Sequence, residues 1–188
     1  KSLSHLLDKN GILIIEDPSF LECIKKVSYD QFYNEHIYIF SALSVKKIIS
    51  KYNLELFEIE KLSTHGGSLR YYIKRTENKK IHIKDSVSKQ INDEIKYGLN
   101  IYPTYKKFGE NVKKSKKNLI NIFKDIKNKK HKIIGYGATA KATTVLNYCK
   151  INEKIIDYFV DTTPDKINRF MPGTKIKIKK YNQKLLDN

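Results

Sequence analysis

The sequence contains few cysteines, few arginines and no long apolar run. Its two cysteines, Cys23 and Cys149, lie far apart and outside any CxxC or Cys/His spacing, which argues against a disulfide framework and against a zinc site in this chain. We expect both to be buried thiols. No stretch approaches the roughly twenty apolar residues that a membrane span needs, and no signal peptide is visible. These absences predict a cytoplasmic protein with no membrane partner.

Arginine is scarce although the chain is strongly basic. Only Arg70, Arg75 and Arg169 occur among 37 Lys and Arg residues, and the formal net charge is +17. Proteins that bind nucleic acid commonly use Arg for bidentate contacts to bases and phosphates. The Lys residues recur along the chain beside many Ile, Asn and Tyr, a composition typical of coding bias. We therefore expect no nucleic-acid partner, while the positive charge suits a phosphate-bearing substrate.

The first part of the chain shows patterns of both helix and strand. A helix is expected to end at Leu7, followed by a turn and a short strand at 12–15. Apolar spacing predicts a helix at 44–52 with Ser44 as its N-cap. Alternating and β-branched residues predict strands at 54–62 and 68–74. The Gly-rich residues between these strands predict a hairpin-like connection.

The second part begins with a long polar stretch that has spaced apolar positions. It predicts two helices that break near Pro103, each with a solvated charged face. A βαβ pattern follows, with a strand at 132–134, a helix at 140–149 and a strand at 155–160. The complete layout is half of an α/β domain, a helical connector and a second βαβ unit.

The densest group of reactive side chains lies at 29–41, after the first predicted strand. Ligands of open α/β sheets bind beyond the carboxyl ends of strands. His36 is suited to proton abstraction near neutral pH, Glu35 can orient an imidazole, and a tyrosine hydroxyl can donate to an enolate oxygen. On the residues alone, a surface loop with a structural histidine is the more common origin of such a stretch.

A second candidate site is the His-Gly-Gly-Ser-Leu-Arg segment at 65–70. Gly66 and Gly67 let the backbone approach a ligand closely and leave amides for an anion, with His65 and Arg70 as further donors. On the pattern alone, a bulged hairpin turn that needs positive φ is the more common origin of these glycines.

A third candidate site is the Gly-Tyr-Gly-Ala-Thr-Ala-Lys segment at 135–141, which opens the predicted helix. Its small residues and the acid that ends the next predicted strand nearly satisfy the dinucleotide fingerprint. These residues are Gly135, Gly137, Ala140 and Asp161. Helix N-terminal amides together with Lys141 favour a phosphate. The segment predicts a phosphate near a helix start more firmly than it predicts NAD.

Several segments, in order along nearly the whole chain, resemble a family of S-adenosylmethionine-dependent C-methyltransferases of deoxysugar biosynthesis. The resemblance rests on Glu-Asp-Pro at 16–18, the tyrosine-rich stretch at 29–41, Thr-His-Gly-Gly-Ser-Leu-Arg at 64–70, the segment at 135–141, and 157–164. Members resemble one another in having an N-terminal zinc-binding lobe, a central methyltransferase domain and a C-terminal Rossmann-like domain. The family often has histidine where this chain has Asn34.

The resemblance implies an α/β fold divided into three parts. Residues 1–76 would be the second half of a class I methyltransferase Rossmann-like domain, 77–130 a helical connector, and 131–188 a truncated Rossmann-like C-terminal domain. The zinc cysteines, the loop that binds S-adenosylmethionine and the acid for its ribose are expected before residue 1. We therefore expect no methyl transfer by this chain alone.

The resemblance also implies roles for individual residues. His36 would remove the proton beside the ketone of a nucleotide-linked sugar, Glu35 would orient His36, and Tyr33 would steady the enolate, which then attacks the methyl donor. The nucleotide-diphosphate sugar would contact nine further residues. These are Tyr29, His65, Gly66, Gly67, Ser68, Arg70, Gly137, Thr139 and Lys141.

Two functions of different classes compete with methyl transfer. An NAD(P)-binding oxidoreductase would use the loop at 135–141, but it leaves the tyrosine-rich stretch without a role. A noncatalytic basic module that binds anions would leave both that stretch and the His-Gly-Gly loop as mere structure. Retained enhancement of NADH fluorescence would favour the oxidoreductase, and salt-sensitive retention on DNA would favour the binding module.

Overall fold

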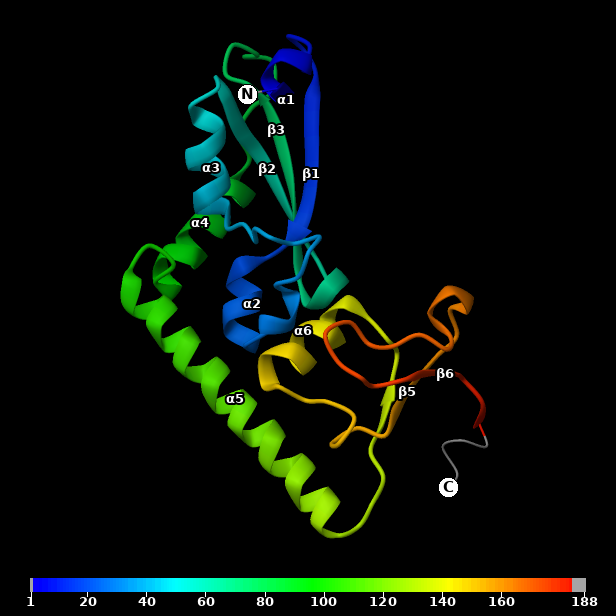
Figure 1. Cartoon of the computed structure of the whole chain (residues 1–188). Helices are drawn as coiled ribbons and strands as arrows, with labels where there is room; N and C mark the ends of the chain where they lie inside the picture. Colours follow the sequence, from blue (N-terminus) through cyan, green and yellow to red (C-terminus); the bar gives the residue numbers. More distant parts are fainter. Residues whose placement is uncertain (1, 184–188) are drawn as a thin grey trace. The chain divides into compact units, whose positions relative to one another are not determined.

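The computed structural model describes residues 2–183, which form two compact units (Figure 1). Unit 1 comprises residues up to Ser28 together with Tyr38–Phe108, and unit 2 comprises Tyr29–Ile37 together with the residues from Gly109 onward. Each unit combines helices with a sheet and has its own hydrophobic core. The expected α/β class is confirmed. The family domain limits at 76 and 130 stay a prediction.

Unit 1 is built on a three-stranded antiparallel sheet in the order β1-β3-β2. The strands are β1 (Ile12–Pro18), β2 (Leu54–Leu62) and β3 (Ser68–Arg75). In the central strand, Ile73 lies opposite Leu13 on one side and Leu56 on the other, and it is completely buried. The predicted hairpin is confirmed, and the predicted strand at 12–15 continues to Pro18.

Within the described residues, unit 1 contains four α-helices, of which the second was not predicted and the third begins earlier than predicted. They are α1 (Ser2–Leu6), α2 (Phe20–Lys26), α3 (Ala42–Ser50) and α4 (Asp85–Tyr97). The N-cap of α3 is Ser41, so the prediction of Ser44 was wrong. The two serines form a reciprocal capping box in which the Ser44 hydroxyl accepts from the Ser41 amide. Ser44 is therefore already inside the helix.

The two polar helices are separated just before Pro103. Helix α4 is capped after Tyr97 by Gly98, whose φ of 92° lies in the left-handed region where glycine is favoured. Helix α5 (Tyr102–Asn128) then begins with Pro103 in its first turn, where a missing amide hydrogen costs nothing. The later part of α5 belongs to unit 2, where Leu119, Phe123 and Ile126 pack on the core. Figure 1 shows α5 as the longest helix of the chain.

Unit 2 contains a parallel sheet in the order β4-β5-β6. Its elements are β4 (Ile134–Tyr136), α6 (Ala140–Cys149), β5 (Tyr158–Asp161) and β6 (Ile178–Lys180). Three short 3-10 helices complete the described chain: η1 (Tyr29–Gln31), η2 (Thr64–Gly66) and η3 (Pro164–Lys166). The limits predicted for α6 are confirmed. The predicted strand at 155–160 begins later because Ile155 and Ile156 donate to the Asn152 carbonyl in a turn.

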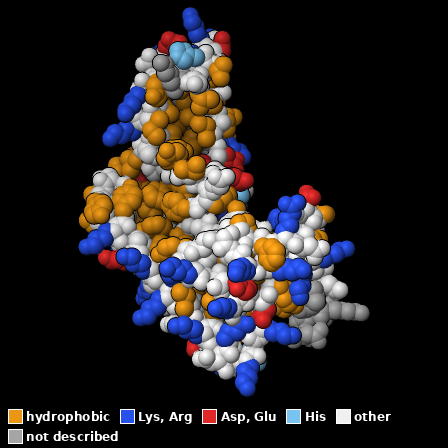
Figure 2. All heavy atoms as spheres, in the orientation of Figure 1, with side chains coloured by type: hydrophobic (Ala, Val, Ile, Leu, Met, Phe, Trp, Pro, Cys, Tyr) orange, Lys and Arg blue, Asp and Glu red, His pale blue; other side chains and the backbone are white. Residues whose placement is uncertain are grey.

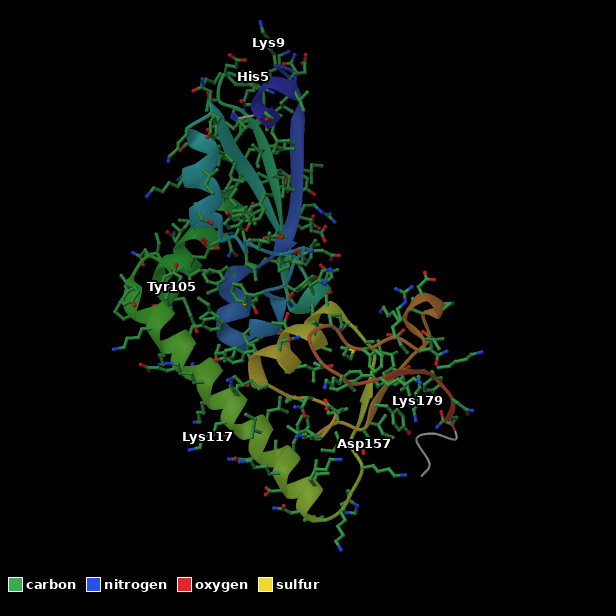
Figure 3. The ribbon with its side chains drawn as sticks, viewed as in Figure 1. His5, Lys9, Tyr105, Lys117, Asp157 and Lys179 are labelled. Carbon is green, nitrogen blue, oxygen red and sulfur yellow. The ribbon has the colours of Figure 1, made fainter. Side chains whose placement is uncertain are left out.

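An ion pair fixes the beginning of the parallel sheet. The Asp157 carboxylate accepts hydrogen bonds from Lys127 at 2.8 Å and from the Ile133 amide at 2.9 Å. Figure 3 labels Asp157 among the side chains of unit 2. The hydrogen bonds from Lys127 and Ile133 hold the pKa of Asp157 below its usual range. Asp157 thus links the end of α5 to the residue before β4.

Cysteines and surface charge follow the expectations from composition. Cys23 and Cys149 are buried free thiols, as predicted. In Figure 2, Lys and Arg side chains are spread over the face of unit 2 that is in view, whereas hydrophobic side chains gather over unit 1. Exposed hydrophobic residues of unit 1 include Ile12 and Ile14 on β1. Among residues 2–183, no helix is long and apolar enough to cross a membrane.

Candidate functional site

Residues 29–37, here called the motif loop, pack against α6 within unit 2. The Tyr29 ring lies 5.3 Å from the Tyr148 ring, and its hydroxyl lies 3.6 Å from the Cys149 sulfur. Burial and the contact with Cys149 raise the pKa of Tyr29 to about 12. One turn earlier on the helix, the Thr144 hydroxyl donates to the Phe32 carbonyl at 3.1 Å. The motif loop is therefore attached to α6 at two levels.

Tyr33 and His36 lie together within one turn of the motif loop. The His36 amide donates to the Tyr33 carbonyl at 2.9 Å, and the two rings meet edge to face with centroids 5.0 Å apart. Burial raises the pKa of Tyr33, and the negative charges of Glu35 and Asp30 raise it further. Because its ionisation is disfavoured, the Tyr33 hydroxyl is a hydrogen-bond donor at neutral pH.

A groove of about 530 Å³ separates part of the motif loop from α6, and we call it the α6 groove. Its walls combine aromatic surface with hydroxyl, amide and carboxylate groups. The lining residues are Phe32, Tyr33, Asn34, Glu35, Ala140, Thr143, Thr144, Asn147 and Pro172. The exposed lining of the groove is mostly apolar with a few polar groups, which is the usual character of a small-molecule site. Among the predicted catalytic residues, Tyr33 and Glu35 line this groove.

The Gly-rich segment at 135–141 is the turn that leads from β4 into α6. Gly137 has a φ of 82°, and a Cβ on Gly135 would lie only 2.4 Å from ring carbons of Phe159. Both glycines are thus required by the fold itself. The Thr139 side chain is the N-cap of α6 and accepts from the Ala142 amide at 3.1 Å.

Asp161, at the end of β5, is engaged by the protein's own donors. Its carboxylate accepts from the Ala138 amide at 2.7 Å and from the Thr163 amide at 2.8 Å, and it pairs with Lys166 at 3.3 Å. Burial alone raises the pKa of Asp161, but these hydrogen bonds outweigh it and hold the pKa well below its usual range. A carboxylate with these partners is poorly placed to accept the hydroxyls of a dinucleotide ribose.

The His-Gly-Gly segment forms a tight turn in unit 1. His65, Gly66 and Gly67 all have positive φ, at 52°, 83° and 127°. The Gly67 carbonyl accepts from the Ser19 amide at 2.9 Å, and the Ser68 hydroxyl donates to the Thr64 carbonyl at 3.0 Å. The hairpin turn that the pattern favoured is confirmed in its geometry.

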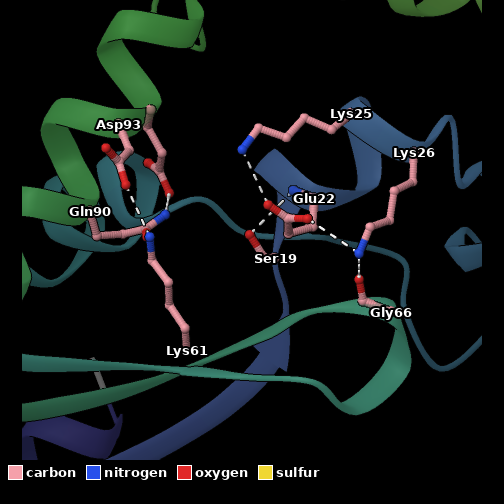
Figure 4. A network of polar contacts seen from close by, with 9 residues as sticks. Ser19, Glu22, Lys25, Lys26, Lys61, Gly66, Gln90 and Asp93 are labelled. Atoms are coloured by element: carbon pink, nitrogen blue, oxygen red, sulfur yellow. Dashed lines mark hydrogen bonds and ion pairs between the residues drawn. The ribbon is translucent and has the colours of Figure 1, made fainter.

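This turn borders a pocket of about 290 Å³ whose cations have partners inside unit 1. Lys26 donates to the Gly66 carbonyl and pairs with Glu22, while Lys61 pairs with Asp93 at 3.0 Å (Figure 4). Both lysines are therefore already paired within unit 1, and neither offers an unpaired positive charge to a phosphate.

Arg70, which the resemblance implied as a substrate contact, lies between two acids on the sheet. Its guanidinium pairs with Glu16 at 2.9 Å and with Glu60 at 3.0 Å. The Tyr72 hydroxyl donates to the same Glu60 carboxylate at 3.0 Å. The arrangement neutralises the charge of Arg70 across the three strands of unit 1.

Two of the three predicted candidate sites belong to one unit. The motif loop with Tyr29, Tyr33, Glu35 and His36, and the start of α6, lie in unit 2. The residues of the hairpin turn and Arg70 belong to unit 1. Within residues 2–183, no three His, Cys, Asp or Glu side chains gather in a way that could hold a metal ion.

Sequence reasoning missed the residues of α6 that meet the motif loop. Thr144 and Asn147 stand in a helix whose polar positions resemble any solvated face. The Asn147 side chain donates to the Pro172 carbonyl at 2.9 Å, and a Cβ on Gly173 would collide with it. In the sequence, Thr144 and Asn147 could be recognised only as a Thr and an Asn spaced three residues apart on one helix, which is a weak indication of a binding face.

Comparison with known proteins identifies the family. Residues 63–187 match the family described as the C-methyltransferase C-terminal domain, and this match covers well over half of the chain. The chain belongs to this family. C-methyltransferase NovU from Streptomyces niveus is 23% identical over 176 residues, which cover 94% of this chain and 42% of NovU. The chain thus spans less than half the length of this curated relative. The resemblance to C-methyltransferases is confirmed at the level of the family.

Proposed function

We propose that this chain supplies the substrate-activating part of an S-adenosylmethionine-dependent C-methyltransferase that acts on a nucleotide-linked keto-deoxysugar. Membership of the C-methyltransferase family supports the type of reaction. The observation that carries the assignment is the α6 groove, since Tyr33 and Glu35 line it beside the hydroxyl and amide groups of α6. Its hydroxyl and amide groups offer hydrogen bonds to the hydroxyls of a sugar.

In the proposed reaction, His36 removes a proton from the carbon beside the sugar ketone. Glu35 orients the imidazole, and the Tyr33 hydroxyl donates a hydrogen bond to the enolate oxygen that develops. A tyrosine phenol is protonated at neutral pH and can donate this hydrogen bond, and the raised pKa of Tyr33 agrees with that state. The enolate carbon then bonds to the methyl group of S-adenosylmethionine, whose methyl–sulfur bond breaks with the electron pair left on sulfur. His36 afterwards releases its proton to solvent.

We assign no residue of this chain to the methyl donor. Asp161, the one acid placed like the ribose ligand of a dinucleotide fold, is occupied by the Ala138 and Thr163 amides. The chain covers 42% of NovU, so the donor site is proposed to lie in other parts of the protein. No zinc site is proposed for the described residues.

The finer fold is likewise a proposal. The antiparallel β3 between β1 and β2 supports an assignment of unit 1 to the end of a class I methyltransferase domain. The parallel β4–α6–β5 arrangement supports a Rossmann-like C-terminal domain. We propose that Thr139 and Lys141 at the start of α6 face the diphosphate of the substrate, with Gly137 allowing its approach.

The test measures proton exchange and methyl transfer by the full-length gene product. The protein is incubated in heavy water with S-adenosylmethionine and a panel of nucleotide-linked 4-keto-6-deoxysugars. We expect deuterium beside the ketone and a product that has gained one CH2. In His36→Ala, both rates should fall about 10²- to 10⁴-fold, the usual contribution of a general base.

The matched control is His131→Ala, an exposed histidine of unit 2 outside the groove, which should retain both rates. Undiminished exchange and methylation in His36→Ala would show that the base lies elsewhere. Absence of both reactions in the unaltered protein with every sugar would overturn the proposed function.

A further inference from the structure

We propose that Thr144 is a positioning residue that ties the motif loop to α6 and so sets the place of Tyr33 and His36. This proposal rests on the proposed function. Its hydroxyl lies 3.1 Å from the Phe32 carbonyl, to which it donates, and the two residues are 112 positions apart in sequence. Phe32 immediately precedes Tyr33, so the bond acts on the backbone that carries the proposed catalytic residues.

The neighbouring Thr143 shows what an ordinary helical threonine does in the same place. Its hydroxyl donates to the Thr139 carbonyl one turn earlier, at 3.1 Å. Helical threonines commonly bond back to their own helix in this way. Thr144 is also near its own i−4 carbonyl, that of Ala140, but at the longer distance of 3.4 Å. The hydroxyl of Thr144 therefore favours a partner outside its helix.

The tether completes a two-point attachment along one face of α6. Tyr148 follows Thr144 by one helical turn, and it contacts the Tyr29 ring at the start of the motif loop. Between Tyr29 and Phe32 the chain forms η1. After Phe32 it makes a turn that is closed by the hydrogen bond from the His36 amide to the Tyr33 carbonyl. Loss of the Phe32 bond removes the one of these two attachments that lies next to Tyr33.

The first test measures amide exchange in the full 188-residue chain by NMR, at the His36 amide that closes the turn. In Thr144→Val, which keeps the shape and removes the donor, exchange at His36 should accelerate about three- to tenfold, as expected for the loss of one hydrogen bond. Thr144→Ser keeps the donor and should restore the slower exchange. Thr143→Val, the matched control on the same helix, should leave exchange at His36 unchanged.

The second test measures kinetics in the full-length gene product with the sugar panel described above. Because a misplaced catalytic group lowers the rate of the chemical step, kcat for methyl transfer should fall about 10- to 100-fold in Thr144→Val. KM should change less than kcat, and Thr144→Ser should recover most of the rate.

Two results would overturn the proposal. One is equal exchange at His36 in Thr144→Val, Thr143→Val and the unaltered chain, which would mean that the bond does not hold the turn. The other is full methyl transfer by Thr144→Val although its exchange has accelerated. If the exchange test succeeds and the unaltered protein methylates no sugar, the tether stands as a structural fact and only the proposed function fails.

Discussion

Glu94 leads to a prediction about the stability of unit 1, because its carboxylate is completely buried at the start of α3. Its two oxygens accept hydrogen bonds from the Ala42 amide at 2.8 Å and the Leu43 amide at 2.9 Å. The Gln90 side chain also donates to it, at 3.0 Å. Together with the N-cap Ser41, this carboxylate satisfies the amides that open the helix.

The substitution Glu94→Gln keeps the shape of the side chain and turns one acceptor oxygen into a donor. That donor must then face a backbone amide or the Gln90 amide, which are donors themselves. One hydrogen bond to a charged group contributes about 1.5–3 kcal/mol, and a partly buried charge at a helix terminus up to about 2 kcal/mol. Relief from burying a charge offsets part of this loss. We expect a net destabilisation of about 2–3 kcal/mol.

The assay is urea unfolding followed by far-ultraviolet circular dichroism, with amide exchange in β3 as a local probe of unit 1. With a slope of about 1–3 kcal/mol per molar urea, the midpoint should fall by on the order of 1 M. Glu110→Gln is the matched control, since Glu110 is exposed on α5, and its free energy of unfolding should change by less than about 0.5 kcal/mol. Equal midpoints for the two variants would refute the reasoning.

Two further predictions concern unit 2. The Asp161 pKa is depressed, so its stabilising contribution is complete above the ordinary pKa of about 3.9 and is lost as pH falls through the depressed value. Asp161→Asn should therefore destabilise by about 1–3 kcal/mol at neutral pH, and urea unfolding should show this difference shrinking in strong acid. Gly135→Ala should cost about 1–3 kcal/mol, because its Cβ would meet the Phe159 ring at 2.4 Å. Gly109→Ala on α5, where a Cβ meets nothing within 4 Å, should instead stabilise slightly in the same assay, and an equal loss in both glycine variants would contradict the steric cause.

Local patterns predicted those elements whose causes are local. The sequence predicted strands β2 and β3 from alternating apolar residues. This pattern arises because β3 is the central strand and its buried residues recur at every second position for much of its length. Helix α6 was predicted with its observed bounds because a Gly-rich turn precedes it, and Thr139 caps its start. Nearby residues decide both features, so a sequence window contains the relevant information.

Contacts between distant residues escaped prediction for the same physical reason. Glu94 lies in a helix whose charged residues were expected to face solvent, and only the position of α3 explains its burial. The motif loop was predicted to contain many reactive side chains, yet nothing near it in the sequence indicates its hydrogen bond to Thr144. The Ser41 cap was missed by one helical turn because two serines in that segment both suit a cap. The candidate site residues were thus proposed from their chemistry, whereas their partners were not predicted.

The arrangement around α6 bears on the choice between methyl transfer and dinucleotide binding. In a dinucleotide fold, the acid after the second strand must face the ribose, and the glycines must admit the pyrophosphate. Here the Asp161 carboxylate holds the Ala138 amide, and Gly135 is needed to make room for Phe159. The protein itself therefore accounts for the features that suggested NAD. What the fold does not require is the α6 groove, where the polar side chains of the motif loop meet those of the helix, and an account of function must begin from that groove.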